Sequence, residues 1–384
     1  MPLSFDYALI GGGLQNGLIA LALRHRQPQA SILLVERDSA IGGNHTWCLH
    51  DGDVAPAAMA WLAPLLVHRW PSYDVHFTDL DRHVALGYAA ITSERFAAIV
   101  HAAMAAGPGA VWLNATARDI GAQHVTLTDG RHVRAKVVIA ALGPDEAATP
   151  ANTGWQKFLG LEIATRAPHG LQTPILMDAR VPQVDGFRFL YVLPLDPHRL
   201  LVEDTVFSDR PHLAASAMRA NALAYAAQRG WEVAAILREE RGVLPMPWTA
   251  PPLTDDPRGP VLAGMQGGWF HPATGYSLAV AARLADWLAC VPPDEARGPG
   301  LQTLRARHAD QASFARKLNW ALFRMAAPAH RNTMMSRFYR RPDEVIRRFF
   351  ALDMHLSDRL RIVLGAPPRK MNLWPRSSQE EVNA

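Results

Sequence analysis

The first part of the chain alternates between short apolar runs and a segment with apolar residues at helical spacing. Tyr7–Ile10 is an apolar run of strand length, and Ile32–Val35 is another. Between them, a glycine triplet at 11–13 leads into the helix-like segment, and the second run ends on the acid Glu36. Strand, tight turn, helix, strand and acid in this order predict a βαβ unit that binds a dinucleotide. A purely structural turn is the alternative.

The glycine turn provides the contacts that a dinucleotide needs. Gly11 lets the chain turn sharply, and Gly13 lets the backbone approach a pyrophosphate at the positive end of the helix. Glu36 lies at the usual distance to accept a ribose hydroxyl. The pattern calls for a third glycine at position 16, where the sequence has Asn16 followed by Gly17. We therefore expect either a helix that sits slightly off the strand or close packing by Gly17.

A second pair of glycines follows the acid. Gly42 and Gly43 resemble the second glycine motif of many FAD proteins. Paired glycines imply close approach of the backbone to another group, here the flavin side of a cofactor. A plain loop explains them as well, and His45 beside them is more often a hydrogen-bonded loop residue than a catalyst.

The next segments return the chain to the first sheet. Residues 54–88 are expected to form loops and short strands, and Ser93 to cap an amphipathic helix that runs to Ala106. A hairpin across Asp129–Gly130 and a buried run, Val137–Leu142, follow. This order is typical of flavin hydroxylase-type domains.

Residues 151–250 change to a series of strand-like stretches. They predict an antiparallel sheet that forms a second domain inserted into the first. A long alanine-rich helix at about Leu213–Arg229 follows, and the charged run Arg238–Arg241 is predicted to be a solvated cluster. The four predicted strands are Leu159–Thr165, Pro174–Asp178, Phe187–Leu195 and Arg199–Phe207.

A second strand, turn and helix come later in the chain. Val261–Gly264 is a short strand that ends in glycine, and a glycine-rich turn then leads into an apolar helix, Leu278–Cys290. This arrangement predicts another anion or cofactor site at the start of the helix. Many FAD folds hold the ribityl chain with an acid just after such a strand, but Met265 and Gln266 stand there.

The C-terminal part, 301–370, is helical in pattern and basic, with fifteen Arg or Lys residues against five Asp or Glu. An ordinary helical cap is one interpretation, and a face that docks on anionic lipid is the other. Residues 377–384 are expected to be disordered. The fold class is α/β, a Rossmann-type FAD/NAD(P)-binding fold with an inserted antiparallel-sheet substrate domain and C-terminal helices. The expected limits are 1–150 for the first part of the dinucleotide domain, 151–255 for the substrate domain, 256–295 for the return to the dinucleotide domain, and 296–384 for the helical region.

Composition narrows the class of protein. The chain has 384 residues, 49% of them hydrophobic and 19% charged, as expected for a globular chain of two or three domains. The net charge of +4 rests almost entirely on arginine, so we discount it as a sign of nucleic-acid binding and expect no nucleic-acid partner. Cys48 and Cys290 lie far apart without metal-type spacing, so we expect a reduced compartment and no metal site. No apolar run reaches the ~20 residues that a membrane-spanning helix needs. The N-terminus lacks a basic n-region, so we expect no secretory signal.

Two adjacent acids lie in a strand that is otherwise apolar. Within Arg199–Phe207, Glu203 and Asp204 point to opposite faces because side chains alternate along a strand. Buried carboxylates are costly unless they are paired or protonated. We therefore expect one acid to line a cavity and the other to meet a partner behind the sheet; a pair of edge acids in water is the alternative. A desolvated carboxyl keeps its proton near neutral pH and can act as a local acid.

These motifs stand in the order found in bacterial lycopene β-cyclases, a family that the chain resembles over nearly its whole length. Asn16 and Met265, which depart from the general nucleotide-binding pattern, fit the pattern of this family. GGNHTW together with LLVEDT is a specific pair. The stretches that carry the resemblance are GGGLQNGLIA, GGNHTW, WPSYDVHF, ITSERFA, HGLQTPILMDA, LLVEDT, FHPATGYSL and RPDEVIRRFF.

The resemblance implies an isomerase, a flavoprotein that does no net redox work and closes both ends of lycopene, through γ-carotene, to give β-carotene. It implies reduced FAD as cofactor, with NADPH as the electron source. It also implies a cytoplasmic protein attached peripherally to the inner membrane, with association with other carotenoid enzymes as a further expectation. Reduced flavin, as an anion, could stabilise a carbocation electrostatically.

The resemblance also implies roles for individual residues. Glu203 is expected to protonate the terminal double bond, and Asp204 to support Glu203 or its strand. His271 and His45 are candidates for the final base, and Glu203 itself is a third. The candidate cofactor-binding residues are Gly11, Gly12, Gly13, Asn16, Gly17, Glu36, Arg37, Gly43, Arg95, Gly264, Gly268, Thr274 and Gly275.

Two other functions are compatible with the same fold. A FAD/NAD(P)H-dependent hydroxylase or reductase of a lipophilic substrate would use the flavin for redox chemistry, since fold alone does not fix the reaction. A nucleotide-binding carotenoid carrier would do no chemistry. A hydroxylase changes the mass of its substrate and a carrier tolerates Glu203→Gln, whereas a cyclase gives an isomer and loses ring formation in that variant.

Overall fold

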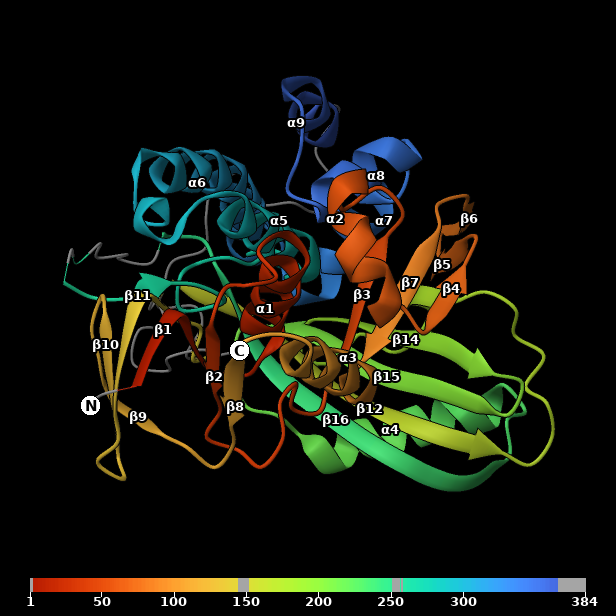
Figure 1. Ribbon diagram of the computed structural model, residues 1–384. Helices are drawn as coiled ribbons and strands as arrows, with labels where there is room; N and C mark the ends of the chain where they lie inside the picture. Colours follow the sequence, from red (N-terminus) through yellow and green to blue (C-terminus); the bar gives the residue numbers. More distant parts are fainter. Residues whose placement is uncertain (1–2, 144–151, 251–255, 257, 365–384) are drawn as a thin grey trace.

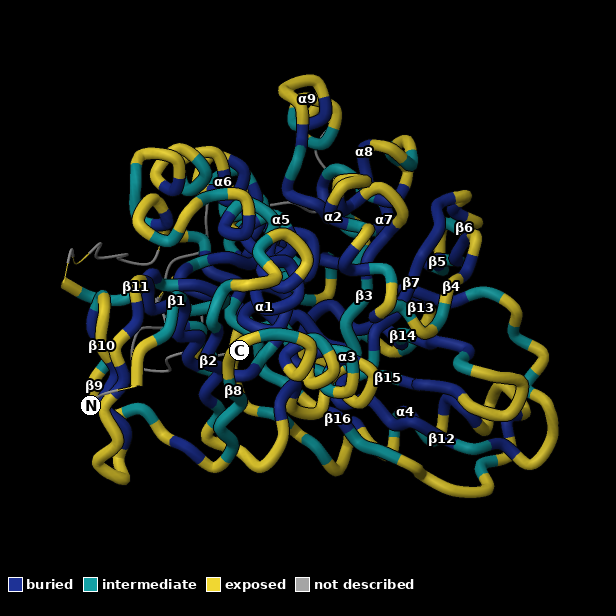
Figure 2. The backbone as a smooth tube through the Cα atoms, in the orientation of Figure 1, coloured by how far each residue is buried: buried dark blue, intermediate teal, exposed yellow. Residues whose placement is uncertain are grey.

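Two large sheets lie side by side, and most of the helices cover them from one side (Figure 1). The computed structural model describes residues 3–143, 152–250, 256 and 258–364. Figure 2 shows the deepest burial where the helices meet the sheets, and exposed backbone at the outer turns.

The first sheet carries the βαβ unit. Its strands are β1 (Leu3–Ile10), β2 (Ile32–Val35), β8 (Gly109–Trp112), β9 (Ala117–Ile120), β10 (His124–Leu127), β11 (His132–Ala140) and β17 (Val261–Leu262). They run in the order β8-β2-β1-β11-β10-β9, with β17 beside β11. β1 pairs in parallel with β2 and β11, so Tyr7 lies opposite both Ile32 and Val137. β10 and β11 form the antiparallel hairpin that the sequence predicts.

Three helices pack together over the first sheet: α1 (Leu14–Arg26), α3 (Ser93–Ala105) and α5 (Leu278–Cys290). α1 is the central one, and its residues from Leu14 to Arg24 are all buried. A helix that is apolar on every side belongs in the interior, so the start of α1 is fixed in place from all directions.

The second sheet is mostly antiparallel. Its strands are β5 (Tyr73–Phe77), β6 (Leu80–Val84), β12 (Thr153–Thr165), β13 (Ile175–Asp178), β14 (Phe187–Asp196), β15 (Arg199–Ser208) and β16 (Val233–Pro247). The order is β16-β12-β15-β14-β13-β5-β6, and the β13–β5 pair is parallel. One face packs on helix α4 (Ala215–Gln228), where Leu161, Val202 and Ala222 belong to one buried cluster. The other face is left for the remaining helices.

A small third sheet and the remaining helices complete the described structure. The small sheet has the order β3-β7-β4, from β3 (Thr46–His50), β7 (Tyr88–Thr92) and β4 (His68–Trp70). The helices are α2 (Pro56–Leu62), α6 (Pro299–Trp320), the π-helix η4 (Ala321–Met325), α7 (Arg331–Phe338), α8 (Asp343–Phe350) and α9 (Leu356–Val363), with 3₁₀ turns η1 (Ala63–Leu65), η3 (Pro293–Glu295) and η5 (Pro328–His330).

Most predicted elements are confirmed, and three local predictions are wrong. The buried run predicted over Val137–Leu142 ends at Ala140, and Leu142 is 45% exposed. The strand Ile32–Val35 and the helix Leu278–Cys290 have the predicted limits. The cap of α3 is Thr92, not Ser93, because the Thr92 side chain accepts the Arg95 N–H. The charged run Arg238–Arg241 lies within strand β16, where Glu240 is buried while Arg241 is exposed, so it is not wholly solvated. Residues 377–384 lie outside the described residues, and the domain limits remain a proposal.

The structure explains the missing third glycine. Asn16 is buried, and its side-chain amide donates to the carbonyl oxygens of Ile10 and Gly11 at 2.9 Å each, which ties the helix to the glycine turn. Gly17 does the close packing instead: a Cβ there would lie 2.1 Å from the Phe96 ring. Of the two expectations, close packing by Gly17 is confirmed.

Gly17→Ala is expected to lower the free energy of unfolding by about 1–3 kcal/mol, because the added methyl group overpacks α1 against Phe96. Gly13→Ala is the matched control, since a Cβ at Gly13 meets nothing within 4 Å. Thermal unfolding followed by circular dichroism compares the two variants. Equal melting temperatures for both would contradict the packing role of Gly17.

Candidate active site

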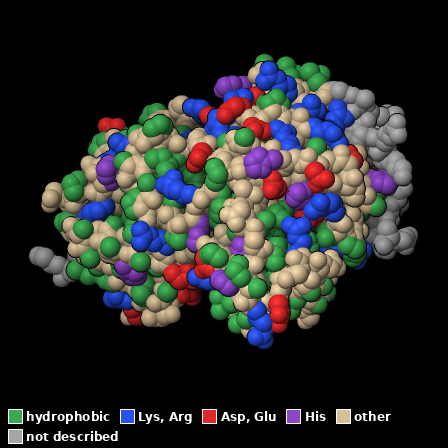
Figure 3. Space-filling view, turned by 90° about the vertical axis from the view of Figure 1, so that its right-hand side faces the viewer, with side chains coloured by type: hydrophobic (Ala, Val, Ile, Leu, Met, Phe, Trp, Pro, Cys, Tyr) green, Lys and Arg blue, Asp and Glu red, His purple; other side chains and the backbone are tan. Residues whose placement is uncertain are grey.

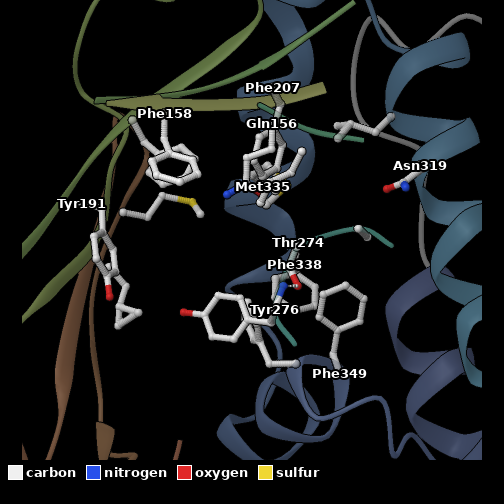
Figure 4. Close-up of a pocket in the computed structure, with 18 of the residues that line it drawn as sticks. Gln156, Phe158, Tyr191, Phe207, Thr274, Tyr276, Asn319, Met335, Phe338 and Phe349 are labelled. Carbon is white, nitrogen blue, oxygen red and sulfur yellow. Dashed lines mark hydrogen bonds between the residues drawn. The ribbon is translucent and has the colours of Figure 1, made fainter. Parts of the chain in front are cut away.

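A cavity of about 680 Å³ lies between the second sheet and helices α7 and α8. Figure 4 shows Phe158 and Phe207 projecting from the strands, and Phe338 and Phe349 from the helices, toward the same space. Much of the remaining lining is also aliphatic, aromatic or methionine. Such a wall suits an elongated apolar ligand.

Two glycines of the second sheet make room for aromatic rings of this region. A Cβ at Gly242 would lie 2.5 Å from the Phe158 ring, and one at Gly154 would lie 2.3 Å from the Phe323 ring of η4. Arg331 is buried beneath Phe323, with its guanidinium carbon 4.6 Å from the ring centroid. The π-helical turn is therefore held against the sheet at the cavity wall.

Glu203 lines this cavity from β15. Its Oε1 accepts a 2.6 Å hydrogen bond from the hydroxyl of Thr205. Burial, and then the nearby charge of Glu240, raise the pKa of Glu203 to about 8, although the Thr205 hydrogen bond acts the other way. A carboxyl with this pKa holds its proton at neutral pH, so Glu203 can donate it to a molecule in the cavity.

Asp204 points to the opposite face of the sheet, as the strand pleat predicts. It is fully buried; its Oδ1 accepts a 2.7 Å hydrogen bond from Arg188, and its Oδ2 accepts a 2.9 Å bond from Asn221 of α4. Arg188 is itself buried. The structure therefore places Asp204 behind the catalytic face, where it ties β15 to β14 and α4.

A second carboxyl, Glu240 of β16, also lines the cavity and was missed from the sequence. Glu240 is 4% exposed, and its Oε2 accepts a 2.9 Å bond from Arg238 and a 3.3 Å bond from Thr46. Arg238 also donates to Glu162 at 3.1 Å. A run of charged residues in a sequence usually predicts a solvent-exposed segment. Glu240 is buried here because β16 pairs with β12, a contact that the sequence alone does not reveal.

Hydroxyl groups line one side of the cavity. Tyr191 is hydrogen-bonded to Cys48 at 3.2 Å and to Tyr88 at 3.1 Å, and Tyr88 is also hydrogen-bonded to Tyr276. In Figure 4 the hydroxyls of Tyr191 and Tyr276 turn toward each other. These hydroxyl and thiol groups are hydrogen-bonded to one another. The tyrosines therefore add aromatic surface to the cavity without exposing an unpaired polar group to it.

The glycine turn before α1 fits an anionic dinucleotide. α1 has no side-chain cap at Gly13, and a Cβ there would meet nothing within 4 Å. The Oε1 atom of Gln15 in the first turn is buried and has no hydrogen-bond partner among the described residues. Glu36 lies beside the turn, with its Oε2 2.6 Å from the N–H of Gly12. Uncapped N–H groups and a glycine gap are what a pyrophosphate requires.

The second glycine turn joins this nucleotide side to the cavity. Gly264 (φ +58°) and Gly268 (φ +74°) adopt the left-handed conformation that favours glycine. Thr274 and Gly275 line the cavity just before α5. Met265, where an acid was expected, also lines the cavity. Glu203 and this turn therefore face one common space.

Other predicted residues lie away from the cavity. Arg37 is exposed, 3.9 Å from Asp38, and the exposed Arg95 donates to the Pro64 carbonyl at 2.8 Å. Gly43 is exposed with φ +60°. His45, by contrast, is among the cavity-lining residues. That Arg37, Gly43 and Arg95 contact a cofactor therefore stays a prediction.

His271 is placed poorly for a base. It is fully buried, its Nδ1 accepts the Ala273 N–H at 3.0 Å, and its Nε2 donates to the Phe349 carbonyl at 2.9 Å. Burial also lowers the pKa of His271 to about 3. Both nitrogens are therefore occupied, and the ring fastens the glycine-rich turn to α8.

Residues 6–375 match the family model described as "Lycopene cyclase protein". The chain is 43% identical to the lycopene beta-cyclase of Pseudescherichia vulneris over 368 residues, which covers 94% of each chain. It is 40% identical to the lycopene beta-cyclase of Pantoea ananas over 377 residues, which covers 95% of each chain.

Solved structures with low sequence identity share the fold. A geranylgeranyl bacteriochlorophyll reductase-like protein from Thermoplasma acidophilum superimposes with a TM-score of 0.64 at 15% identity, covering 94% of this chain and 96% of that one. The p-nitrophenol 4-monooxygenase of Pseudomonas putida gives a TM-score of 0.63 at 16% identity, covering 92% and 99%. These matches confirm the predicted Rossmann-type fold class.

Proposed function

The chain belongs to the lycopene cyclase family, and from this premise we propose that it is a lycopene β-cyclase, an isomerase that closes both ends of lycopene, through γ-carotene, to β-carotene. One observation carries the mechanism: Glu203, a carboxyl that keeps its proton at neutral pH, lines an aromatic and aliphatic cavity. A hydrocarbon substrate has no polar group that the protein could bind. Its site therefore needs an apolar cavity of matching shape and one proton donor.

Glu203 donates its proton to the terminal double bond of lycopene. The next double bond attacks the resulting carbocation and closes the six-membered ring. The Glu203 carboxylate then accepts a proton from the adjacent ring carbon, which gives the β end and restores the acid. One proton is added and one removed, so the product is an isomer of the substrate. The aromatic faces of Phe158, Tyr191 and Tyr276 line the cavity, and such faces stabilise a cation.

We propose FAD as the cofactor, held by the turn Gly11–Gly13, the start of α1 and Glu36, with Thr274 and Gly275 at the cavity end. A protein that shares the fold is described as a probable FAD-dependent monooxygenase, with a TM-score of 0.56. When bound in its reduced form, the flavin would supply negative charge beside the cavity. The reduced state, NADPH as its electron source, and association with other carotenoid enzymes stay predictions from the family.

Anaerobic incubation of the purified protein with lycopene and reduced FAD tests this function, with products separated by chromatography and weighed by mass spectrometry. Cyclisation gives γ-carotene and β-carotene at the mass of lycopene. A parallel incubation with NADPH in air tests the flavin-dependent hydroxylase, which takes its oxygen atom from O₂ and would give a product heavier by one oxygen. A product heavier by two hydrogens in the anaerobic incubation would instead favour the reductase. Recovery of unchanged lycopene under all conditions would contradict both.

We also propose that α9 rests on the membrane surface. None of the helices in the described ranges is long and apolar enough to cross a membrane. On α9 and just after it, Leu356 (73% exposed), Leu360 (46%), Val363 (54%) and Leu364 (61%) recur at helical spacing. Ile362 and Val363 also line the cavity, which supports a membrane-facing position of α9 beside it. Arg and Lys side chains surround apolar ones at the top of the molecule, where α9 lies (Figures 1 and 3).

The double variant Leu356→Ser, Leu360→Ser is expected to bind anionic vesicles about a hundredfold more weakly or worse, because each buried leucine contributes about 1.5–3 kcal/mol. Co-sedimentation with phosphatidylglycerol vesicles measures the bound fraction. Val184→Ser, which removes an apolar residue that is 63% exposed on the β13–β14 connection, is the control. Equal sedimentation of all proteins with and without vesicles would reject the proposal.

A further inference from the structure

Glu203 and Glu240 lie in one row across three neighbouring strands. In the register of the second sheet, Gly160 of β12 pairs with Glu203 of β15 on one side and with Glu240 of β16 on the other. Residues paired in this way present their side chains on the same face of a sheet. Both carboxyl groups line the cavity, and the strand between them has no side chain at that position.

The absence of a side chain at Gly160 lets the two acids approach each other. A Cβ built at Gly160 would lie 3.2 Å from the Cγ of Glu240 and 3.5 Å from the Cβ of Glu203. The aliphatic parts of both glutamate side chains therefore lie above the Cα atom of Gly160. Any larger residue at 160 would stand between them.

The two carboxyls have different partners, which decides where a shared proton resides. Glu240 is bonded to the guanidinium of Arg238 at 2.9 Å and to the Thr46 hydroxyl at 3.3 Å. Glu203 has a neutral partner, the Thr205 hydroxyl. A cation favours the charged form of the acid that it contacts, so the negative charge belongs on Glu240 and the proton on Glu203.

We propose that Glu240 is a second carboxyl of the active site that, as an anion facing Glu203 across Gly160, keeps the proton on Glu203 between turnovers. This inference rests on the proposed cyclase function. Glu240 acts through Glu203 and is a positioning residue, since ring closure needs no additional group. Once Glu203 has given up its proton, two carboxylates face each other, and their repulsion drives Glu203 to take a proton back.

The other groups around Glu203 do not replace this charge. Asp204 lies behind the sheet, paired with Arg188. Tyr191, opposite Glu203 on β14, has its pKa raised well above the ordinary value by burial, and burial raises the pKa of Cys48 to about 12, so both are neutral at working pH.

The remaining walls carry few other charged or titratable groups. His45 comes from the turn before β3, Arg337 from α7, and Tyr276 and Tyr339 from the turns before α5 and after α7. Burial raises the pKa of both tyrosines well above the ordinary value, so they are neutral. Glu162 follows along β12, where Arg238 and Arg199 both bond to it. Glu240 is therefore the anion of the cavity wall nearest to Glu203 in the sheet register.

The pH dependence follows from the direction of the shift. Burial and Glu240 raise the pKa of Glu203 to about 8, so Glu203 is protonated and active below that pH and loses activity as the pH rises through it. Burial also raises the pKa of Glu240, against the pull of Arg238. Removing the charge at 240 lowers the pKa of Glu203 and moves the alkaline limb of activity to lower pH.

The test titrates Glu203 in the purified, flavin-bound protein without lycopene, by the infrared band of its protonated carboxyl. The band is assigned by its loss in Glu203→Gln. In Glu240→Gln the midpoint is expected to fall by about one pH unit, the effect of a like charge two strand spacings away, ~10 Å, in a protein interior. Glu240→Asp, which keeps the charge, should restore most of the shift. Glu239→Gln is the matched control, because Glu239 pairs with Arg219 at 3.5 Å outside the cavity.

Gly160→Ala provides a second variant that keeps both charges and inserts a methyl group between them, so the midpoint should fall by less than in Glu240→Gln. Unchanged midpoints in both variants would overturn the inference. A lowered midpoint in a protein that forms no rings from lycopene would instead overturn the proposed function and leave the coupling of the two acids standing. The alkaline limb of cyclase activity should move together with the midpoint.

Discussion

Glu203→Gln is expected to reduce ring formation from lycopene by about 10²–10⁴-fold, the usual contribution of a positioned acid. The amide has the shape of the carboxyl and still accepts the Thr205 hydrogen bond, but it has no acidic proton to give. The measurement is the initial rate of γ-carotene plus β-carotene formation with reduced FAD under anaerobic conditions. The loss should appear at every pH, because no titration can restore the missing proton.

Binding must survive for this result to identify a proton donor. Lycopene binding and FAD absorbance should stay close to those of the wild-type protein in Glu203→Gln, because the cavity keeps its shape. Glu239→Gln, on the α4 side of β16 where Glu239 pairs with Arg219, should retain full activity. A Glu203→Gln protein that still closes rings at a normal rate would show that another group is the proton donor.

Asp204→Ala is expected to lower the free energy of unfolding by about 3–5 kcal/mol, the cost of leaving a buried charge without its partner. Arg188 would lose its 2.7 Å ion pair in the interior, and Asn221 would lose the acceptor that joins α4 to the sheet. Urea unfolding followed by far-UV circular dichroism measures the change. Asp204→Asn, which keeps an acceptor oxygen, should cost less.

The control for Asp204 is an acid of the same strand hairpin that faces water. Asp196 lies 3.8 Å from Arg199, with both side chains exposed by more than two fifths, so Asp196→Ala should change stability by less than about 1 kcal/mol. The folded fraction of Asp204→Ala should still form rings. An Asp204→Ala protein of normal stability with no activity would show that Asp204 takes part in the chemistry, contrary to its position behind the sheet.

The local features of the fold could be predicted from the sequence because each depends on neighbouring residues. The run Ile32–Val35 is apolar throughout and is bounded by polar residues, and it is the strand β2. The alternation of side chains was enough to place Glu203 and Asp204 on opposite faces. Family resemblance added the reaction, which no spacing of residues could supply.

The features that could not be predicted depend on contacts between distant segments. Glu240 looked solvated within its charged run, and it becomes buried because β16 pairs with β12. His271 looked like a candidate base, but its nitrogens are occupied by Ala273 and by Phe349, a residue far along the chain. The helix cap is Thr92, one position before the predicted Ser93. Which of the two residues caps the helix depends on the backbone conformation where the helix begins. Gly160 is the one sequence feature that pointed to Glu240. It could be interpreted only once the strand register showed that Gly160 lies between Glu203 and Glu240.

In the mechanism proposed above, the location of Glu203 at one fixed point of the cavity wall has a kinetic consequence. An extended polyene with two reactive ends cannot bring both ends to Glu203 in one orientation. The half-cyclised molecule must therefore withdraw, reverse end for end and enter again before the second ring forms. The one-ring species is then a free intermediate that rises and decays during the reaction, and its lifetime depends on how much protein competes to rebind it.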